Sequence, residues 1–233
     1  MNPVMVALDV RTAEEAVRLA KKVIDHVGAF KVGLGLLHGP GPGVIGALSD
    51  LGRPVFADAK LHDIPSQVER AAQRLGEHGA RWVTAHISGT RSMLEAAVAG
   101  LSDGAGGGAV GILGVSVLTS LDSADLASVG IASSPGKLVS RMARVAADAG
   151  CEGVVCSPKE LGVVAEVAPN LVKVTPGIRP SGSSDDDQSR VSTPEDALRR
   201  GATYLVIGRP ITRAPDPAAA AAEIAEQISR LDG

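Results

Sequence analysis

The run DAKLHD at residues 58–63 gathers three ionisable side chains within a short stretch of sequence. On a β-strand, Asp58 and Lys60 would lie on the same side of the backbone, and Asp63 follows three residues later. Nearby carboxylates favour the protonated form of a lysine, and a protonated lysine held in place can act as a general acid. The alternative is a surface ion-pair network. Surface pairs contribute only about 0–1 kcal/mol to stability, so stability alone is a weak reason to group three charges here. The spacing therefore favours a catalytic cluster of Asp58, Lys60 and Asp63.

A second group of residues is typical of an anion-binding site. The segments TPGIRP and IGRP place Gly177, Arg179, Gly208 and Arg209 at the ends of two apolar runs. Glycine lets backbone N–H groups approach an anion, and arginine can donate two hydrogen bonds to phosphate oxygens. The alternative is glycine in ordinary turns and arginine on the surface. We favour a phosphate site, which predicts a phosphorylated small molecule as substrate.

Eight short apolar runs, most of them followed by a helical stretch, would position these residues. Continuous apolar sequence is typical of strands buried on both faces of a parallel sheet. The alternation predicts an α/β protein, a (β/α)8 TIM barrel formed by residues 1–233 as one domain. The predicted strands are 3–9, 30–34, 54–60, 82–88, 109–118, 153–157, 171–177 and 204–210, and the predicted helices include 12–27, 64–79, 90–101, 136–149, 158–167, 194–200 and 217–231.

Barrel enzymes carry their active sites at the carboxyl ends of the strands. Asp9 ends the first predicted strand, Lys31 lies in the second, and DAKLHD ends the third. The polar stretch 179–190 follows the seventh strand, and its length and composition predict a lid. Two local signals predict helix starts: a capping box of Thr12 and Glu15, and an N-cap at Thr193 before Pro194.

Composition and charge argue against several other classes of protein. Lys and Arg number 23 against 26 Asp and Glu, and the chain has one Trp, one Tyr and two Phe, so nucleic-acid binding is not expected. Cys151 and Cys156 lack zinc-ligand spacing and are interpreted as reduced and structural. The N-terminus does not resemble a signal peptide, and no apolar run approaches the roughly 20 residues of a membrane span. A cytoplasmic protein is predicted.

The segments VALDV, FKVG, DAKLHDIP, VLTS, VCSPKE, TPGIRP and VIGRPIT follow one another along nearly the whole chain. In this order they resemble the orotidine 5′-phosphate decarboxylase family. The motif Asp-x-Lys-x-x-Asp-Ile-Pro combined with TPGIRP and IGRP is highly specific, whereas DxKxxD alone also occurs in related barrel enzymes that act on sugar phosphates. The resemblance implies conversion of orotidine 5′-phosphate to UMP in de novo pyrimidine biosynthesis, with no metal or organic cofactor.

The resemblance also implies a role for individual residues. Lys60 would stabilise the carbanion at C6 of the pyrimidine and protonate it, while Asp58 would lie against the departing carboxylate. Together with Lys31 they would form a charge array that Asp63 completes from the other subunit of a homodimer, and Gln67 would reach the same neighbouring site. The implied substrate-binding residues are Asp9, Lys31, Asp58, Ile64, Gln67, Thr119, Arg179, Gln188, Gly208 and Arg209.

Three positions depart from the family pattern. Gln67 stands where the family usually has Thr, and Gly35 and Leu37 stand where it commonly has Glu and Phe. Two other functions stay open, one because related barrel enzymes share DxKxxD and the other because of these departures.

The first alternative is a metal-dependent decarboxylase or aldolase acting on a keto sugar phosphate. The Ile-Pro after Asp63 and the presence of Gln188 argue against it. His38, His62 and His86 could suggest a metal site, but such relatives hold their metal with carboxylates, and the fourth predicted strand adds none. The second is a nucleotide-binding protein without catalysis, which the intact Asp58–Lys60–Asp63 motif disfavours.

Overall fold

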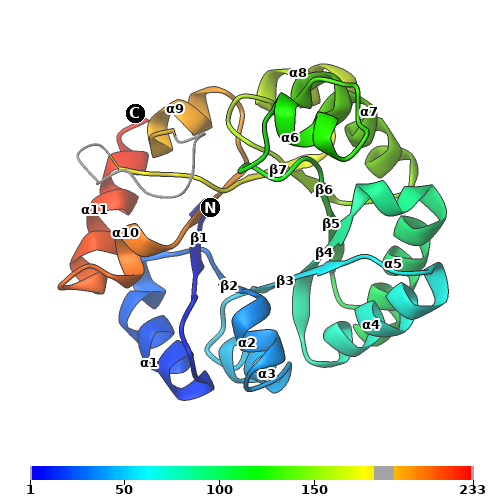
Figure 1. The fold of residues 1–233 in the computed structure, drawn as a ribbon. Coiled ribbons are helices and arrows are strands. Elements are labelled where there is room, and N and C mark those ends of the chain that lie inside the picture. Colours follow the sequence, from blue (N-terminus) through cyan, green and yellow to red (C-terminus); the bar gives the residue numbers. More distant parts are fainter. Residues whose placement is uncertain (1, 181–191, 232–233) are drawn as a thin grey trace.

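A closed barrel of eight parallel strands forms the centre of the computed structural model, which describes residues 2–180 and 192–231. Each strand pairs with the next, and β8 pairs with β1, so the barrel has no open sheet edge. Figure 1 shows the strands as an inner ring with the helices outside it. The predicted (β/α)8 barrel is confirmed. The strands are β1 (Val4–Ala7), β2 (Ala29–Val32), β3 (Val55–Leu61), β4 (Ala80–His86), β5 (Gly111–Val115), β6 (Gly153–Val155), β7 (Val172–Thr175) and β8 (Tyr204–Ile207).

The long helices lie close to the predicted segments, whereas the short helices α2, α6 and α10 were not predicted. These have four to six residues, too few for an apolar periodicity to be visible in the sequence. No helix among the described residues is long and apolar enough to cross a membrane. The helices are α1 (Ala13–Val23), α2 (Leu34–His38), α3 (Gly43–Ser49), α4 (Pro65–Glu77), α5 (Thr90–Gly104), α6 (Ser123–Ser128), α7 (Pro135–Asp148), α8 (Leu161–Val167), α9 (Pro194–Arg199), α10 (Arg209–Thr212) and α11 (Pro217–Ser229), with 3-10 turns η1 (Ile24–His26) and η2 (Ile87–Gly89).

The two predicted helix starts differ in outcome. Thr193 accepts the N–H of Asp196 through its hydroxyl, and Pro194 is the first residue of α9, as predicted. Thr12 likewise accepts the N–H of Glu15 at the start of α1. The reciprocal half of that capping box is wrong, because the Glu15 carboxylate accepts the N–H of Arg11 instead of that of Thr12.

The barrel interior is closed at the end where the strands begin. Trp82 and Tyr204 lie near the starts of β4 and β8 and contact each other edge to face, with ring centroids 5.3 Å apart. Glu152 accepts a 2.9 Å hydrogen bond from Trp82 Nε1 and a bidentate pair of bonds from Arg81. Side chains alternate along each strand between this interior and a larger outer layer packed under the helices. The barrel interior is therefore left to open at the carboxyl ends of the strands.

Cys151 and Cys156 are buried free thiols. Burial raises the pKa of Cys151 to about 12. It does the same for Cys156, where nearby Glu160 adds to the rise. Both thiols are protonated at neutral pH and unsuited to nucleophilic chemistry.

Candidate active site

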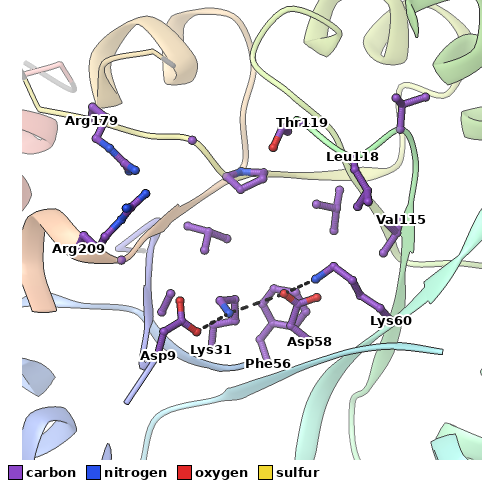
Figure 2. Close-up of a pocket in the computed structure, with 17 residues that line it drawn as sticks. Asp9, Lys31, Phe56, Asp58, Lys60, Val115, Leu118, Thr119, Arg179 and Arg209 are labelled. Atoms are coloured by element: carbon purple, nitrogen blue, oxygen red, sulfur yellow. Dashed lines mark hydrogen bonds and ion pairs between the residues drawn. The ribbon is translucent and has the colours of Figure 1, made fainter. Parts of the chain in front are cut away.

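A cavity of about 290 Å³ opens at the carboxyl ends of the barrel strands. Residues from β1, β2, β3, β5, β6, β7 and β8, or from the loops that follow them, line it, which is where barrel enzymes hold their substrates. Its walls are largely aliphatic, and its charged side chains gather on the floor and at one end, as Figure 2 shows. The charged residues among its lining are Asp9, Lys31, Asp58, Lys60, Arg179 and Arg209.

Four of these side chains form a row of alternating charge across the floor. Lys31 Nζ lies 3.3 Å from Asp9 Oδ1 and 3.6 Å from Asp58 Oδ2, and Lys60 Nζ donates a 2.7 Å hydrogen bond to Asp58 Oδ2. The side chain of Asp9 is 64% exposed and that of Lys60 is 31% exposed, while Lys31 and Asp58 are more deeply buried between them. The two residues at the ends of the row are therefore the most accessible to a ligand.

Asp58 stays ionised in spite of its burial. Burial is the largest single influence and by itself raises the pKa of this carboxyl. The charges of Lys31 and Lys60, together with hydrogen bonds from Lys60 and Thr84, outweigh burial and hold the pKa below its ordinary value. Asp58 is therefore a carboxylate held between the ammonium groups of Lys31 and Lys60.

An irregularity in β3 aims Asp58 and Lys60 into the cavity together. Ala57 pairs with Val83 of β4, and the next pair joins Leu61 to Ala85, so residues 58–60 stand opposite one residue of β4. This is a bulge, which bends a strand and redirects its side chains. Lys60 has a φ of 49°, in the left-handed region that residues other than glycine rarely adopt. The predicted shared side of Asp58 and Lys60 is correct, but a bulge produces it instead of a regular strand.

Gly33, which directly follows β2, leaves room for the charged row. A Cβ atom at this position would lie 2.9 Å from Asp9 Oδ1 and 3.1 Å from Lys31 Nζ. Both distances are too short for ordinary contact, so a side chain would push the carboxylate and the ammonium out of place. The glycine of the FKVG segment thus leaves room for the close approach of Asp9 and Lys31.

Two arginines lie at the other end of the cavity. Figure 2 shows the side chains of Arg179, after β7, and Arg209, after β8, directed toward each other on the side of the cavity opposite Lys60. Gly208 precedes Arg209 as the N-cap of α10, and Arg179 Nη1 donates a 3.0 Å hydrogen bond to the Ile178 carbonyl. Loops after the seventh and eighth strands and the start of a short extra helix are a common phosphate site in such barrels.

The charges of the cavity match a ligand with two anionic groups. Four cationic side chains face it, against the two carboxylates Asp9 and Asp58, among the described lining residues. The aliphatic walls, such as Val115, Val155 and Val206, keep the local dielectric low and strengthen these charges. Such a cavity can hold a phosphate at the arginines and stabilise negative charge on a carbon beside Lys60.

The comparison with known families decides the classification. The model of the orotidine 5′-phosphate decarboxylase / HUMPS family matches residues 2–224. The chain belongs to this family. The family predicted from the sequence is thereby confirmed.

Individual members of the family match over almost their whole length. An orotidine 5′-phosphate decarboxylase of Anaeromyxobacter sp. (strain K) is 49% identical over 220 residues, covering 94% of this chain and 95% of the relative. One from Thermobifida fusca (strain YX) is 44% identical over 230 residues, covering 98% and 96%. The crystal structure of orotidine 5′-phosphate decarboxylase from Lactobacillus acidophilus superposes with a TM-score of 0.85 at 34% identity, covering 97% of this chain and 99% of that one.

Most of the residues that the family resemblance singled out lie together in this cavity. Asp9, Lys31, Asp58, Lys60, Thr119, Arg179, Gly208 and Arg209 all line it. Asp63, Ile64 and Gln67 do not line it and belong to an exposed segment at the start of α4. Gln188 and most of the predicted lid 179–190 lie outside the described residues.

Two polar residues of β4 near the charged row had no predicted role. Thr84 is fully buried and contacts both Asp58 and Lys60. The sequence feature that could have indicated it is a lone threonine within the apolar run WVTAH. His86 is half-buried with its ring centroid 5.4 Å from that of His62. Burial, then the charges of His62 and Lys60, lower the pKa of His86, and the charge of Asp58 opposes them. Among the described residues, no three His, Cys, Asp or Glu side chains are arranged to hold a metal ion.

Proposed function

We propose that this protein decarboxylates orotidine 5′-phosphate to UMP in pyrimidine biosynthesis, without a metal or organic cofactor and with Lys60 as the proton donor. The observation that supports this most is the alternating row Asp9–Lys31–Asp58–Lys60 on the floor of a cavity that has two arginines at its other end. Family membership and the names of the curated relatives support the same substrate.

The charges suggest one orientation of the substrate. Its phosphate would bind Arg179, Arg209 and the backbone at Gly208, because guanidinium groups are well suited to phosphate oxygens. Its ribose hydroxyls would then meet Asp9 and Lys31, at the exposed end of the row. Thr119 would hydrogen-bond the pyrimidine ring, and Gln188 would bridge phosphate and base.

In this orientation the reacting carbon lies beside Lys60. The bond between C6 and its carboxylate breaks, the electron pair stays on C6, and carbon dioxide leaves. The Lys60 ammonium stabilises that electron pair and then transfers a proton to C6, which gives UMP and a neutral amine that solvent reprotonates. Asp58, held ionised, repels the substrate carboxylate before the bond breaks.

The chemistry of the carboxylates supports a reaction without a metal. Asp9 and Asp58 are the carboxylates of the described lining, and each already lies within 3.3 Å of a lysine ammonium. A divalent cation would have to compete with Lys31 or Lys60 for these oxygens. The ammonium groups themselves supply the positive charge that the carbanion requires.

The exposed segment before and at the start of α4 supports a homodimer in which Asp63, Ile64 and Gln67 reach the neighbouring active site. Residues 62–67 are all exposed, and the apolar side chain of Ile64 is 62% exposed. Asp63 Oδ1 accepts a 2.6 Å hydrogen bond from the Ile64 N–H, which holds the carboxylate on this surface. An apolar side chain at the surface, beside a carboxylate that does not line its own cavity, fits burial against a second copy.

A direct assay tests the reaction. The purified protein, incubated with orotidine 5′-phosphate and excess chelator, should lose substrate absorbance and form UMP. Absence of turnover with or without magnesium would refute the proposed function. Turnover that needs magnesium, or that occurs only with a keto sugar phosphate, would instead favour the metal-dependent alternative.

Subunit mixing tests the contribution of the second copy. Lys60→Ala and Asp63→Ala proteins should each be nearly inactive. Equal mixing with subunit exchange gives heterodimers that hold one intact site, and restores about a quarter of wild-type activity if Asp63 acts across the interface. If both residues act within one chain, mixing restores nothing.

A cytoplasmic location is part of the same proposal. The two free thiols Cys151 and Cys156 support it, because reduced cysteines are usual in that compartment.

A further inference from the structure

The structure assigns a positioning role to Thr84 of β4: its hydroxyl holds the β3 bulge closed and orients Asp58 and Lys60 for the proposed decarboxylation. This inference rests on the proposed function and adds a residue that does not itself line the cavity. Thr84 is the single β4 residue opposite residues 58–60, and its hydroxyl contacts the first and the last of these three.

The two hydrogen bonds of Thr84 have a defined direction. The backbone N–H of Lys60 can only donate, so Thr84 Oγ1 accepts from it at 2.9 Å. An ionised carboxylate can only accept, so the Thr84 hydroxyl hydrogen is directed to Asp58 Oδ1 at 3.0 Å. One oxygen therefore links the backbone of the proposed proton donor to the side chain of the carboxylate beside it.

Thr84 and Lys60 bind different oxygens of the Asp58 carboxylate. Oδ1 accepts from Thr84, whereas Oδ2 accepts from Lys60 Nζ and lies 3.6 Å from Lys31 Nζ. Without the Thr84 hydroxyl, Oδ1 would lose the bond that fixes the rotation of the carboxylate. The position of Oδ2 would then be held only by its contacts with the two lysines.

The burial of Thr84 makes the contact hard to replace. Its exposed fraction is 0%, so bulk water does not reach this position. The backbone of Lys60 lies in a left-handed conformation that persists only where its surroundings impose it. The hydrogen bond from the Lys60 N–H to Thr84 is one such constraint, because it fixes the last residue of the bulge against β4.

Other charged groups around Asp58 stay the same when Thr84 is changed. They are Lys31 on β2, Lys60 on β3 and His86 at the end of β4, with Asp9 beyond Lys31. Because the Thr84 hydrogen bond is one of the influences that lower the pKa of Asp58, its loss should raise that pKa. The acid limb of the activity profile should then move to higher pH.

The test compares Thr84→Val, which keeps the shape but has no hydroxyl, with Thr84→Ser, which keeps the hydroxyl. Thr203→Val is a control for the loss of a threonine-to-backbone hydrogen bond away from the site, since the exposed Thr203 accepts the N–H of Lys173 through Oγ1 at the end of the barrel where the strands begin. Each purified variant is assayed for kcat, KM and the pH dependence of kcat with orotidine 5′-phosphate. Circular dichroism and thermal unfolding establish folding.

Thr84→Val should lower kcat about 10- to 100-fold, the effect expected of misplacing catalytic groups. KM should change little because the arginine end is untouched, and the acid limb should shift to higher pH. Thr84→Ser should stay within about threefold of wild type, since it can make the same two bonds. Thr203→Val should keep the wild-type kcat and pH profile.

An active wild-type protein with an unchanged kcat and acid limb in Thr84→Val would overturn this inference alone, whereas an inactive wild-type protein would overturn the proposed function. Equal losses in Thr84→Ser and Thr84→Val would also contradict it. If Thr84→Val does not fold, Thr84→Cys carries the same expectations, because a thiol of similar size forms only weak hydrogen bonds.

Discussion

Replacing Asp58 with asparagine removes the negative charge that lies between two ammonium groups. At an effective dielectric constant of about 20, the 2.7 Å contact with Lys60 corresponds to about 6 kcal/mol and the 3.6 Å contact with Lys31 to about 5 kcal/mol. The cost of burying the carboxylate offsets much of this attraction, and removing one partner of a buried pair usually costs about 3–5 kcal/mol. Because Lys60 is partly exposed, we expect about 3 kcal/mol, the lower end.

The pH dependence identifies the carboxylate as the cause. Burial raises the pKa of Asp58, but Lys31, Lys60 and the hydrogen bonds lower it further, so folding favours the ionised form. The stabilisation is therefore complete above the ordinary aspartate pKa and is lost as the pH falls through the lower native value. The stability difference between wild type and Asp58→Asn should stay constant from about pH 6 to 8 and shrink below about pH 4.

Urea unfolding followed by circular dichroism, at one protein concentration, measures this difference. Asp9→Asn is the matched control, because Asp9 pairs with Lys31 at 3.3 Å but its side chain is 64% exposed. It should cost at most about 1 kcal/mol. An Asp58→Asn protein as stable as wild type, or a difference that persists unchanged to about pH 3, would refute the reasoning.

Three other predictions address other parts of the molecule. Lys60→Ala should lower kcat by at least about 10⁴-fold with an unchanged circular dichroism spectrum. A kcat within about tenfold of wild type would contradict its role as proton donor. Arg209→Ala should lower kcat/KM for orotidine 5′-phosphate about 10- to 100-fold, but leave turnover of phosphate-free orotidine unchanged. Trp82→Phe removes the 2.9 Å hydrogen bond to Glu152. In urea unfolding it should lose about 1–2 kcal/mol of stability, with wild-type kinetics.

The barrel could be predicted because buried parallel strands are apolar on both faces and therefore stand out in the sequence. The runs VMVA and YLVI show this for β1 and β8. Short helices such as α10 carry no comparable signal, since four residues complete little more than one turn.

The candidate site was predictable where one strand end determines the position of a residue. Asp9, Lys31 and Arg209 each lie at or beside a strand end, so the order of strands brings them to one cavity. The β3 bulge was not predictable, because nothing in DAK distinguishes a bulged strand from a regular one. Thr84 depends on that bulge, so its contacts could not be derived either. Asp63 would act on another copy of the chain, and the fold of one chain does not position it there.

The scarcity of aromatic residues also shapes the electrostatics of the cavity. Trp82 and Tyr204 are used at the opposite end of the barrel, and Phe56 is the one aromatic residue among the described lining of the cavity. An aromatic face can attract a lysine or arginine through its π-electrons. Apart from Phe56, the described walls offer no aromatic face, and the ammonium groups of Lys31 and Lys60 lie beside the carboxylates of Asp9 and Asp58. The pyrimidine ring, with little to stack on, would be oriented mainly by these charges and by polar contacts.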